Sequence, residues 1–112
     1  MLNASKLLAR KNKALLELIF LCMFFVYVLY SKKDNNLYTG CTNDLERRIK
    51  EHQSGHQIST KSRGPFELVY YEYCKEKDDA FARERQLKSG KGKKYLKSRL
   101  KTFFENIISN RL

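Results

Sequence analysis

A single apolar stretch, residues 18–30, decides what kind of molecule this chain can form. Four cations precede it, Lys6, Arg10, Lys11 and Lys13, so the start of the chain resembles the basic and apolar regions of a signal peptide. The stretch has only 13 residues, whereas roughly 20 are needed to span a bilayer, and no small-residue cleavage site follows it. Its second half is rich in aromatic and β-branched residues, as is typical of a buried strand. The stretch therefore predicts the first strand of a folded domain.

We place the start of that domain at Met23, because a translation start there would leave a compact protein that begins with the strand. Residues 1–22 are predicted to be a basic N-terminal extension, which an initiation site assigned too early would explain. Residues 23–112 are predicted to be one domain, since a chain of 112 residues has the length of a single domain. The extension holds four of the 23 Lys and Arg residues, so most of the positive charge belongs to the domain.

The charge of the chain points to a polyanionic partner. The formal net charge is +11 and the sequence pI is near 9.7. A small domain this basic usually binds nucleic acid, or less often an acidic membrane surface. The alternative is a surface charge that serves only solubility. We expect nucleic acid as the partner and no stable membrane association.

The three cysteines, Cys22, Cys41 and Cys74, are widely spaced and contain no C-x-x-C pair. Structural zinc sites and redox pairs usually place two cysteines close together in sequence. The cysteines therefore predict reduced thiols in a cytoplasmic protein rather than a metal site or a disulfide.

After Met23 the chain alternates short strands and helices. Strands are predicted at residues 24–31, 36–40 and 66–74, and the first two form an antiparallel hairpin because only five residues separate Ser31 from Leu37. Helices are predicted from Asn43, with Glu46 completing a capping box, to about Ser54, from residue 78 or 79 to 89, and over residues 91–106. The pattern predicts an α/β fold with a small, mostly antiparallel three-stranded sheet flanked by three helices.

Two of the predicted helices direct a charged side chain toward the core. Leu45, Arg48, Ile49 and His52 share one helix face, and Glu84 lies on the apolar side of a later helix. An inward cation needs a carboxylate or an anionic ligand, or else it extends to the rim. An inward glutamate is either the partner of Arg48 or a metal ligand at the edge of the core. The residues alone leave these alternatives open.

The order of these residues resembles the GIY-YIG nuclease superfamily. The matching elements are Phe25-Val26-Tyr27, Tyr38-Thr39-Gly40, Arg48 ten residues after Tyr38, and Glu84 in a later helix. The resemblance covers about residues 24–100 and is closest to small single-domain bacterial members similar to the N-terminal endonuclease domain of the excinuclease subunit UvrC. Phe25 replaces the first Gly of the signature and Thr39 replaces Ile, and both tyrosines stay in place. Cys41 stands where the UvrC-like members carry a Lys.

This resemblance implies an endonuclease that hydrolyses DNA phosphodiester bonds with one divalent ion, Mg²⁺ or Mn²⁺. It implies a structure- or backbone-directed enzyme of DNA repair or processing, with RNA still open as a substrate. The implied site residues are Arg48 for the scissile phosphate, Glu84 for the metal, Tyr27 as general base, Tyr38 to orient the water or the phosphate, and His52 to assist proton transfer. A phenol with a pKa near 10 is a poor base, and Arg48 together with the metal would lower that pKa.

Cations outside this set are candidates for holding the nucleic-acid backbone. They are Lys61, Arg63, Lys88, Lys91, Lys93 and Lys94. The last four fall in the run KSGKGKK, which lacks the spacing of a P-loop and could instead be a solvated turn between helices. The alternative function is a non-catalytic nucleic-acid-binding module that kept the nuclease fold.

Overall fold

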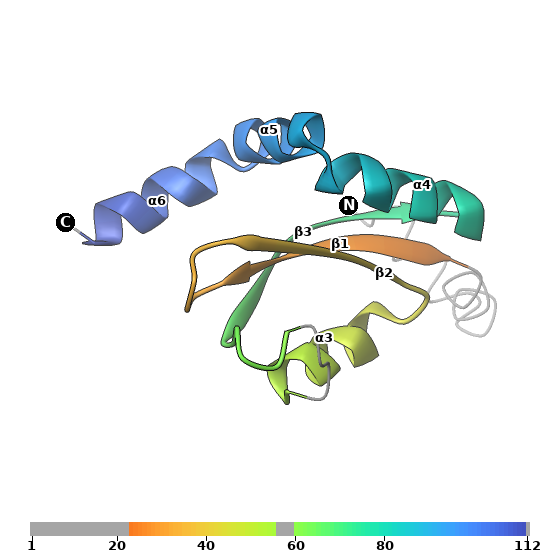
Figure 1. The fold of residues 1–112 in the computed structure, drawn as a ribbon, viewed down its shortest axis with the longest axis horizontal. Coiled ribbons are helices and arrows are strands. Elements are labelled where there is room, and N and C mark those ends of the chain that lie inside the picture. The colour runs from red at the N-terminus through yellow and green to blue at the C-terminus, as the bar shows by residue number, and fades with distance from the viewer. Residues whose placement is uncertain (1–22, 56–59, 112) are drawn as a thin grey trace, which may run out of the picture.

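The computed structural model describes residues 23–55 and 60–111, which form one sheet with helices on both sides (Figure 1). The strands are β1 (Phe24–Ser31), β2 (Leu37–Thr42) and β3 (Phe66–Cys74), and the helices are α3 (Leu45–Gln53), α4 (Lys77–Lys88), α5 (Gly90–Arg99) and α6 (Lys101–Arg111). All neighbouring strands are antiparallel, in the order β2-β1-β3. The predicted α/β class and the three-stranded antiparallel sheet are confirmed. The predicted extension, residues 1–22, lies outside the described residues.

The predicted single helix over residues 91–106 is wrong, because the chain forms two helices there that meet at Leu100. The backbone of Leu100 leaves the helical conformation, with φ −104° and ψ 25°. Beyond this break, Phe103 and Phe104 of α6 contact Tyr30 of β1, with ring centroids 5.3 and 6.4 Å away. The change of direction lets α6 reach the sheet. The described part of the chain therefore has four helices rather than three.

The boundaries of two predicted elements also shift. The second strand runs from Leu37 to Thr42 rather than from residue 36 to 40. The N-cap of α3 is Asp44, one residue after the predicted cap at Asn43, and the Asp44 carboxylate accepts a hydrogen bond from the Arg47 N–H at 3.1 Å. Side chains such as Asp at this position satisfy helix N–H groups that have no partner within the helix. The cap fixes where α3 leaves β2, and with it the positions of Arg48 and His52.

Alternate side chains of β1 are buried on opposite faces of the sheet. Val26 and Val28 pack beneath α4 and α5, together with Ala80, Leu87 and Leu96. Tyr27 and Leu29 face the other way, where Leu45 and Ile49 of α3 pack against them. This separation follows from the two-residue period of a strand. It leaves the outer edge of β2 lying between α3 on one side and α4 on the other (Figure 1).

The joint between α4 and α5 is rigid. The hydroxyl of Ser89 accepts a hydrogen bond from the Gly92 N–H at 3.1 Å and caps α5. A Cβ on Gly92 would collide with the backbone of α4 at Leu87, so the two helices can pack this closely only with glycine there. The guanidinium of Arg83 lies over the Tyr95 ring, 5.0 Å from its centroid, and ties α4 to α5. The joint therefore fixes the position of α5 relative to α4.

None of the helices within residues 23–55 and 60–111 has the length and hydrophobicity of a membrane span.

Candidate active site

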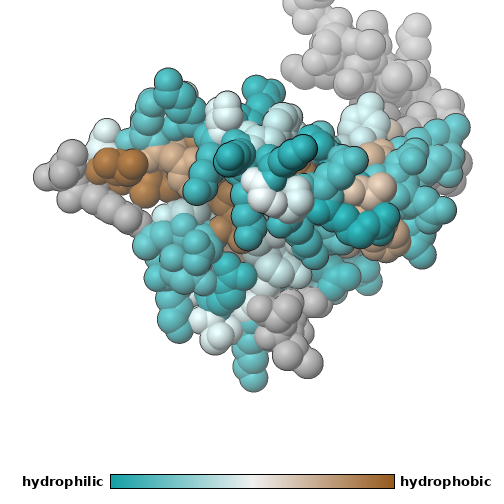
Figure 2. Space-filling view, turned by 45° about the horizontal axis from the view of Figure 1, so that its top comes forward, coloured by the Kyte–Doolittle hydropathy of each residue, from teal (hydrophilic) through white to brown (hydrophobic). Residues whose placement is uncertain are grey.

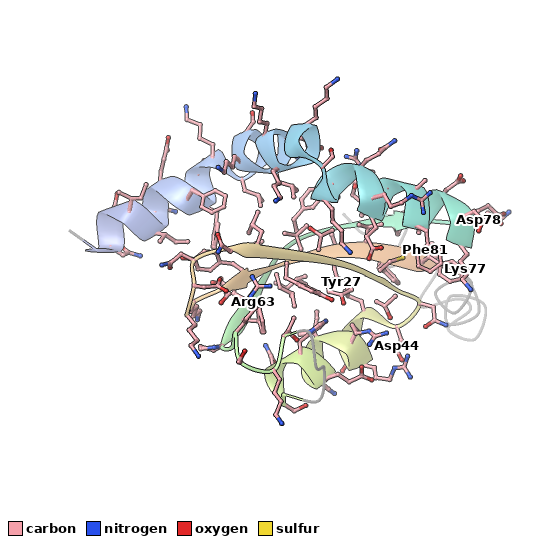
Figure 3. The ribbon with its side chains drawn as sticks, in the orientation of Figure 1. Tyr27, Asp44, Arg63, Lys77, Asp78 and Phe81 are labelled. Atoms are coloured by element: carbon pink, nitrogen blue, oxygen red, sulfur yellow. The ribbon has the colours of Figure 1, made fainter. Side chains whose placement is uncertain are left out.

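The candidate site is built around Tyr27, which lies in the central strand but extends toward the open edge of β2 (Figure 3). Tyr27 is paired with Gly40 across the β1–β2 hairpin. A Cβ at Gly40 would collide with the phenol ring and hydroxyl of Tyr27. Glycine in the interior of a strand commonly marks such a close approach. The missing side chain lets the buried phenol cross over β2 to the edge of the sheet.

A chain of hydrogen bonds runs from this phenol into the protein. The Tyr27 hydroxyl lies 2.8 Å from Nε2 of His52, and Nδ1 of His52 lies 2.6 Å from the Thr60 hydroxyl. His52 and Thr60 are buried, with 2% and 1% of their surfaces exposed. The ring of Tyr38 completes the group, with centroids 6.4 Å from Tyr27 and 5.1 Å from His52. The structure therefore brings together Tyr27, Tyr38 and His52, which the sequence placed on three separate elements.

Burial sets the protonation of this group. It raises the pKa of Tyr27 well above the usual 10, with a smaller contribution from Tyr38, while the positive charge of Arg48 acts in the opposite direction. Burial, reinforced by Arg48, lowers the pKa of His52 below 6.5. A neutral imidazole has one donor and one acceptor nitrogen. The neutral Tyr27 phenol can therefore donate to Nε2 while Nδ1–H donates to Thr60.

Arg48 and Glu84, the two inward charges, do not pair with each other. Nη1 of Arg48 lies 3.2 Å from a carboxylate oxygen of Glu51 on the same helix. The carboxylate of Glu84 is 3.8 Å from the ammonium of Lys88, one turn along α4. Nε of Arg48 is buried and has no hydrogen-bond partner within the described part of the chain. Each charge thus has a partner on its own helix, and the Arg48 guanidinium keeps donor capacity for an anion.

Glu84 has the chemistry of a Mg²⁺ ligand. Its side chain is 18% exposed. Burial raises the pKa of both Tyr27 and Cys41, and the negative charge of Glu84 adds to both shifts. Within residues 23–55 and 60–111, His, Cys, Asp and Glu side chains do not gather in groups of three or more. Mg²⁺ accepts a single protein carboxylate because it retains several of its waters. The residues present therefore fit a divalent ion held by Glu84 and water.

The predicted nucleic-acid-binding cations occupy different places. Lys88 and Lys93 line a hollow of about 240 Å³ beside Tyr38 and the first half of β2. The side chains of Lys61, Lys91 and Lys94 are exposed. Figure 2, which turns α4 and α5 toward the viewer, shows a largely hydrophilic surface over these helices.

Arg63, the remaining predicted nucleic-acid-binding cation, is held by other residues of the protein. Its Nε donates to the Asp34 carboxylate at 2.7 Å, and its guanidinium carbon lies 6.0 Å from the centroid of the Tyr38 ring. The same ion pair lowers the pKa of Asp34 to about 2. Arg63 therefore fastens its loop to the β1–β2 turn.

Comparison with known proteins settles the family. Residues 23–96 match the GIY-YIG catalytic domain. The chain belongs to the GIY-YIG family. Its nuclease domain makes nucleic acid the substrate class, in agreement with the charge of the chain.

Relatives of this GIY-YIG domain include proteins of the UPF0213 group. One from Clostridium perfringens is 48% identical over 67 residues, which are 59% of this chain and 71% of the relative. Another, from the archaeon Haloquadratum walsbyi, is 39% identical over 66 residues, 58% of this chain and 73% of the relative. A solution structure of the UPF0213 protein BH0048 from Bacillus halodurans is 40% identical, covers 68% of this chain and 83% of its own, and has a TM-score of 0.44.

Two residues of the candidate site were not predicted from the sequence. Thr60 holds His52 from a loop whose polar composition gives no sign that one member is buried. That loop is positioned by the end of β1, where the Ser31 hydroxyl donates to the Arg63 carbonyl at 2.5 Å. Glu51, the partner of Arg48, looks like any exposed charge on a helix. An i, i+3 search for carboxylates around Arg48 would have found it.

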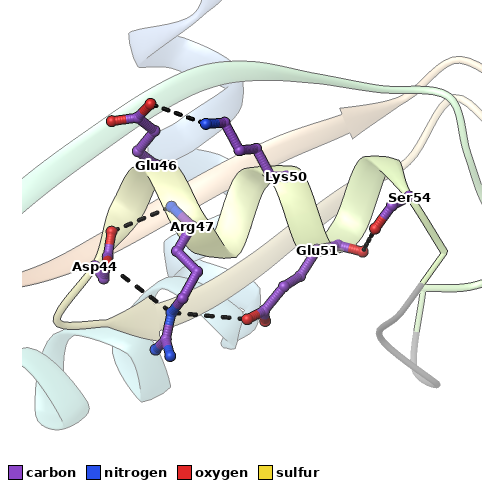
Figure 4. A pocket seen from close by; sticks show the side chains of 6 residues that line it. All are labelled: Asp44, Glu46, Arg47, Lys50, Glu51 and Ser54. Atoms are coloured by element: carbon purple, nitrogen blue, oxygen red, sulfur yellow. Dashed lines mark hydrogen bonds and ion pairs between the residues drawn. The ribbon is translucent and has the colours of Figure 1, made fainter.

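A second hollow in the GIY-YIG domain, of about 620 Å³, lies on the outer face of α3 (Figure 4). Its charged side chains neutralise one another, with Lys50 3.1 Å from Glu46 and Arg47 3.7 Å from Glu51. The lining has three acidic and two basic side chains, a net negative charge that would repel a phosphate, and no buried polar group without a partner. We therefore place the candidate site at the β2 edge and not on this face.

Proposed function

We propose that this protein is a Mg²⁺- or Mn²⁺-dependent endonuclease that hydrolyses DNA phosphodiester bonds in DNA repair or processing. The observation that carries the proposal is the hydrogen-bonded chain Tyr27–His52–Thr60. The charges of Arg48 and Glu84 both act on the phenol at one end of this chain. A non-catalytic binding module has no need for a buried, neutral His joined to a buried phenol. Recognition is directed at the structure or the backbone of the DNA, because the cations around the site can contact phosphates, and phosphate contacts position a protein without reading the sequence.

Each residue has a role that its surroundings support. Arg48 binds the scissile phosphate through its guanidinium, whose planar fork matches phosphate oxygens. Tyr27 accepts a proton from the attacking water as its own phenolic proton moves to Nε2 of His52, 2.8 Å away. Thr60 keeps the imidazole oriented through Nδ1. Tyr38 packs against both rings and orients the water or the phosphate.

The raised pKa of Tyr27 is the main obstacle to this role. A divalent ion bound by Glu84 would supply positive charge that lowers this pKa and stabilises the leaving oxygen. Arg48 contributes in the same direction from α3. His52 offers the phenolic proton an acceptor that is neutral near pH 7.

The experiment that tests the proposal replaces Glu84 with Gln and measures DNA nicking and unfolding side by side. We expect Mg²⁺-dependent nicking to be lost. The free energy of unfolding should change by only about 0.5 kcal/mol, because the pair of Glu84 with Lys88 is a helical i, i+4 pair. Glu105→Gln is a matched control, since Glu105 also forms an i, i+4 pair at 3.8 Å, with Lys101 on α6.

The outcomes separate the alternatives. A loss of about 3–5 kcal/mol with nicking retained would mean that Glu84 compensates a buried cation, and the metal assignment would be wrong. If wild-type protein binds DNA but never nicks it with Mg²⁺ or Mn²⁺, the chain is a binding module that kept the nuclease fold.

A further inference from the structure

The end of β2 next to helix α4 carries a pocket that is lined by Arg48 of the candidate site and by Lys77, which has no role so far. It has a volume of about 230 Å³ and is lined by Cys41, Asn43, Arg48, Lys77 and Phe81, among others. We propose that this pocket is a second phosphate subsite, in which Lys77 binds the backbone phosphate next to the one held by Arg48. This subsite rests on the proposed function, and it adds where the substrate strand lies on the protein surface.

Lys77 is placed and available for such a contact. Its ammonium lies 5.6 Å from the centroid of the Phe81 ring. Burial raises the pKa of Cys41, which lines the same pocket, and the positive charge of Lys77 acts in the opposite direction. Lys77 forms no ion pair with any carboxylate among residues 23–55 and 60–111. Figure 3 shows Lys77 and Phe81 at the end of the molecule where Asp44 caps α3. A cation held by an aromatic ring, without a carboxylate partner, keeps its charge for a ligand.

Arg48 makes the same pocket attractive to an anion. Its side chain lines the pocket, and its buried Nε has no hydrogen-bond partner within residues 23–55 and 60–111, which is unfavourable for a buried donor. A phosphate on the Arg48 guanidinium brings neighbouring phosphates of the same strand close to Lys77, because both side chains line one pocket. The volume is below the about 300–1,000 Å³ of pockets that enclose whole small-molecule ligands. It suits a phosphate and part of a sugar.

The pocket has a counterpart at the other end of β2. Lys77, Phe81, Glu84 and Lys88 recur at helical spacing on α4 and form one face. Lys77 opens onto the new pocket, and Lys88 opens onto the hollow beside Tyr38. Eleven residues of α-helix separate the two lysines by about 16 Å, at about 1.5 Å per residue. A strand lying along the β2 edge would therefore meet positive charge on both sides of Glu84.

The test measures nucleic-acid binding without catalysis. Wild type, Lys77→Ala and Lys75→Ala would be titrated, in EDTA and at several salt concentrations, into fluorescently labelled single-stranded and duplex DNA. Lys75 is exposed, lies two residues away and does not line the pocket, so its removal changes the net charge equally. We expect Lys77→Ala alone to reduce the log–log salt slope by about 0.7 on the single strand or about 0.9 on the duplex. Lys77→Arg should restore it.

Two results would overturn the subsite: an unchanged slope in Lys77→Ala, or the same fall in Lys75→Ala. Neither bears on catalysis, because wild-type nicking is measured separately. A wild-type protein that nicks DNA while Lys77→Ala binds normally removes the subsite and leaves the proposed function standing. A wild-type protein that binds DNA through Lys77 but fails to nick it supports the subsite and removes the proposed function.

Discussion

At the scale of single residues, Gly40 and Tyr27 act as a pair. The tyrosine belongs to the central strand, and the glycine leaves the space that lets the buried phenol lie over β2. The second glycine of the family signature therefore has a physical reason in this chain. Gly40 is needed because any side chain at this position would displace the Tyr27 phenol.

Gly40→Ala should test this pairing. The new methyl group meets the Tyr27 ring, so we expect the unfolding free energy to fall by about 1–3 kcal/mol from overpacking, and nicking to be abolished as the phenol moves. Denaturant unfolding and a nicking assay measure both. Gly90→Ala is the matched control, because nothing lies within 4 Å of a Cβ there; it should be neutral or slightly stabilising. Equal nicking by Gly40→Ala and wild type would show that the phenol position is unimportant.

His52 should make the stability of the fold depend on pH. Its pKa is lowered in the folded protein, so the unfolded state binds a proton first as the pH falls. The His52 contribution is therefore fully present above the unfolded pKa of about 6.5 and is lost as the pH falls from there toward the folded pKa. We expect the stability difference between wild type and His52→Gln to shrink between pH 7.5 and 5.5, measured by urea unfolding. A constant difference would contradict a buried neutral imidazole.

At the scale of elements, the α4–α5 joint places the lysines of the run KSGKGKK on the surface of the protein. Ser89 and Gly92 fix the start of α5, so residues 90–94 of the run KSGKGKK belong to a helix. Replacing Lys91, Lys93 and Lys94 with Ala should weaken DNA binding and reduce the log–log salt slope by about 0.9 for each duplex phosphate that these lysines neutralise. Fluorescence titration measures the slope. The fold should persist, because all three side chains are exposed.

A control for that triple variant removes the same charge elsewhere. Lys32, Lys50 and Lys75 are exposed and lie outside α5. If Ala at these three positions reduces the slope as much as the α5 variant does, the effect reports net charge alone, and α5 is no specific part of the interface.

Elements with strong local signals were predictable from the sequence. The β-branched and aromatic run of β3 begins and ends where predicted, at Phe66 and Cys74, and the stripe of α3 correctly directed His52 inward. The break at Leu100 was not predictable, because it depends on Phe103 and Phe104 contacting a strand about seventy residues earlier. The same holds for the buried Thr60, whose partner comes from another element.

The relation between Arg48 and Glu84 shows the limit of helical periodicity. The pattern correctly placed both side chains on inward faces. It could not distinguish an ion pair between Arg48 and Glu84 from two separate ion pairs, each formed with a residue of the same helix. Distances decide this: Arg48 meets Glu51 at 3.2 Å and Glu84 meets Lys88 at 3.8 Å. Such local pairs need only the i, i+3 and i, i+4 spacing that the sequence already contains.

At the scale of the whole molecule, residues 23–111 contain every residue of the candidate site. A variant that starts at Met23 should therefore fold, bind DNA and nick it as the full chain does. Circular dichroism, thermal unfolding and the titration above would compare the two. Precipitation of the shorter chain beside a well-behaved full-length protein would mean that residues 1–22 contribute to the core, and the domain boundary would be wrong.

The open edge of β2 has a consequence for the protein as a solute. An edge strand exposes backbone N–H and C=O groups that can pair with a strand of another molecule, and natural proteins protect such edges with charge. Lys88 and Lys93 stand at one end of β2, and Arg48 and Lys77 at the other, so two copies approaching edge to edge would repel each other. The cations that we propose bind the substrate therefore also hinder the β2 strands of two free molecules from pairing edge to edge.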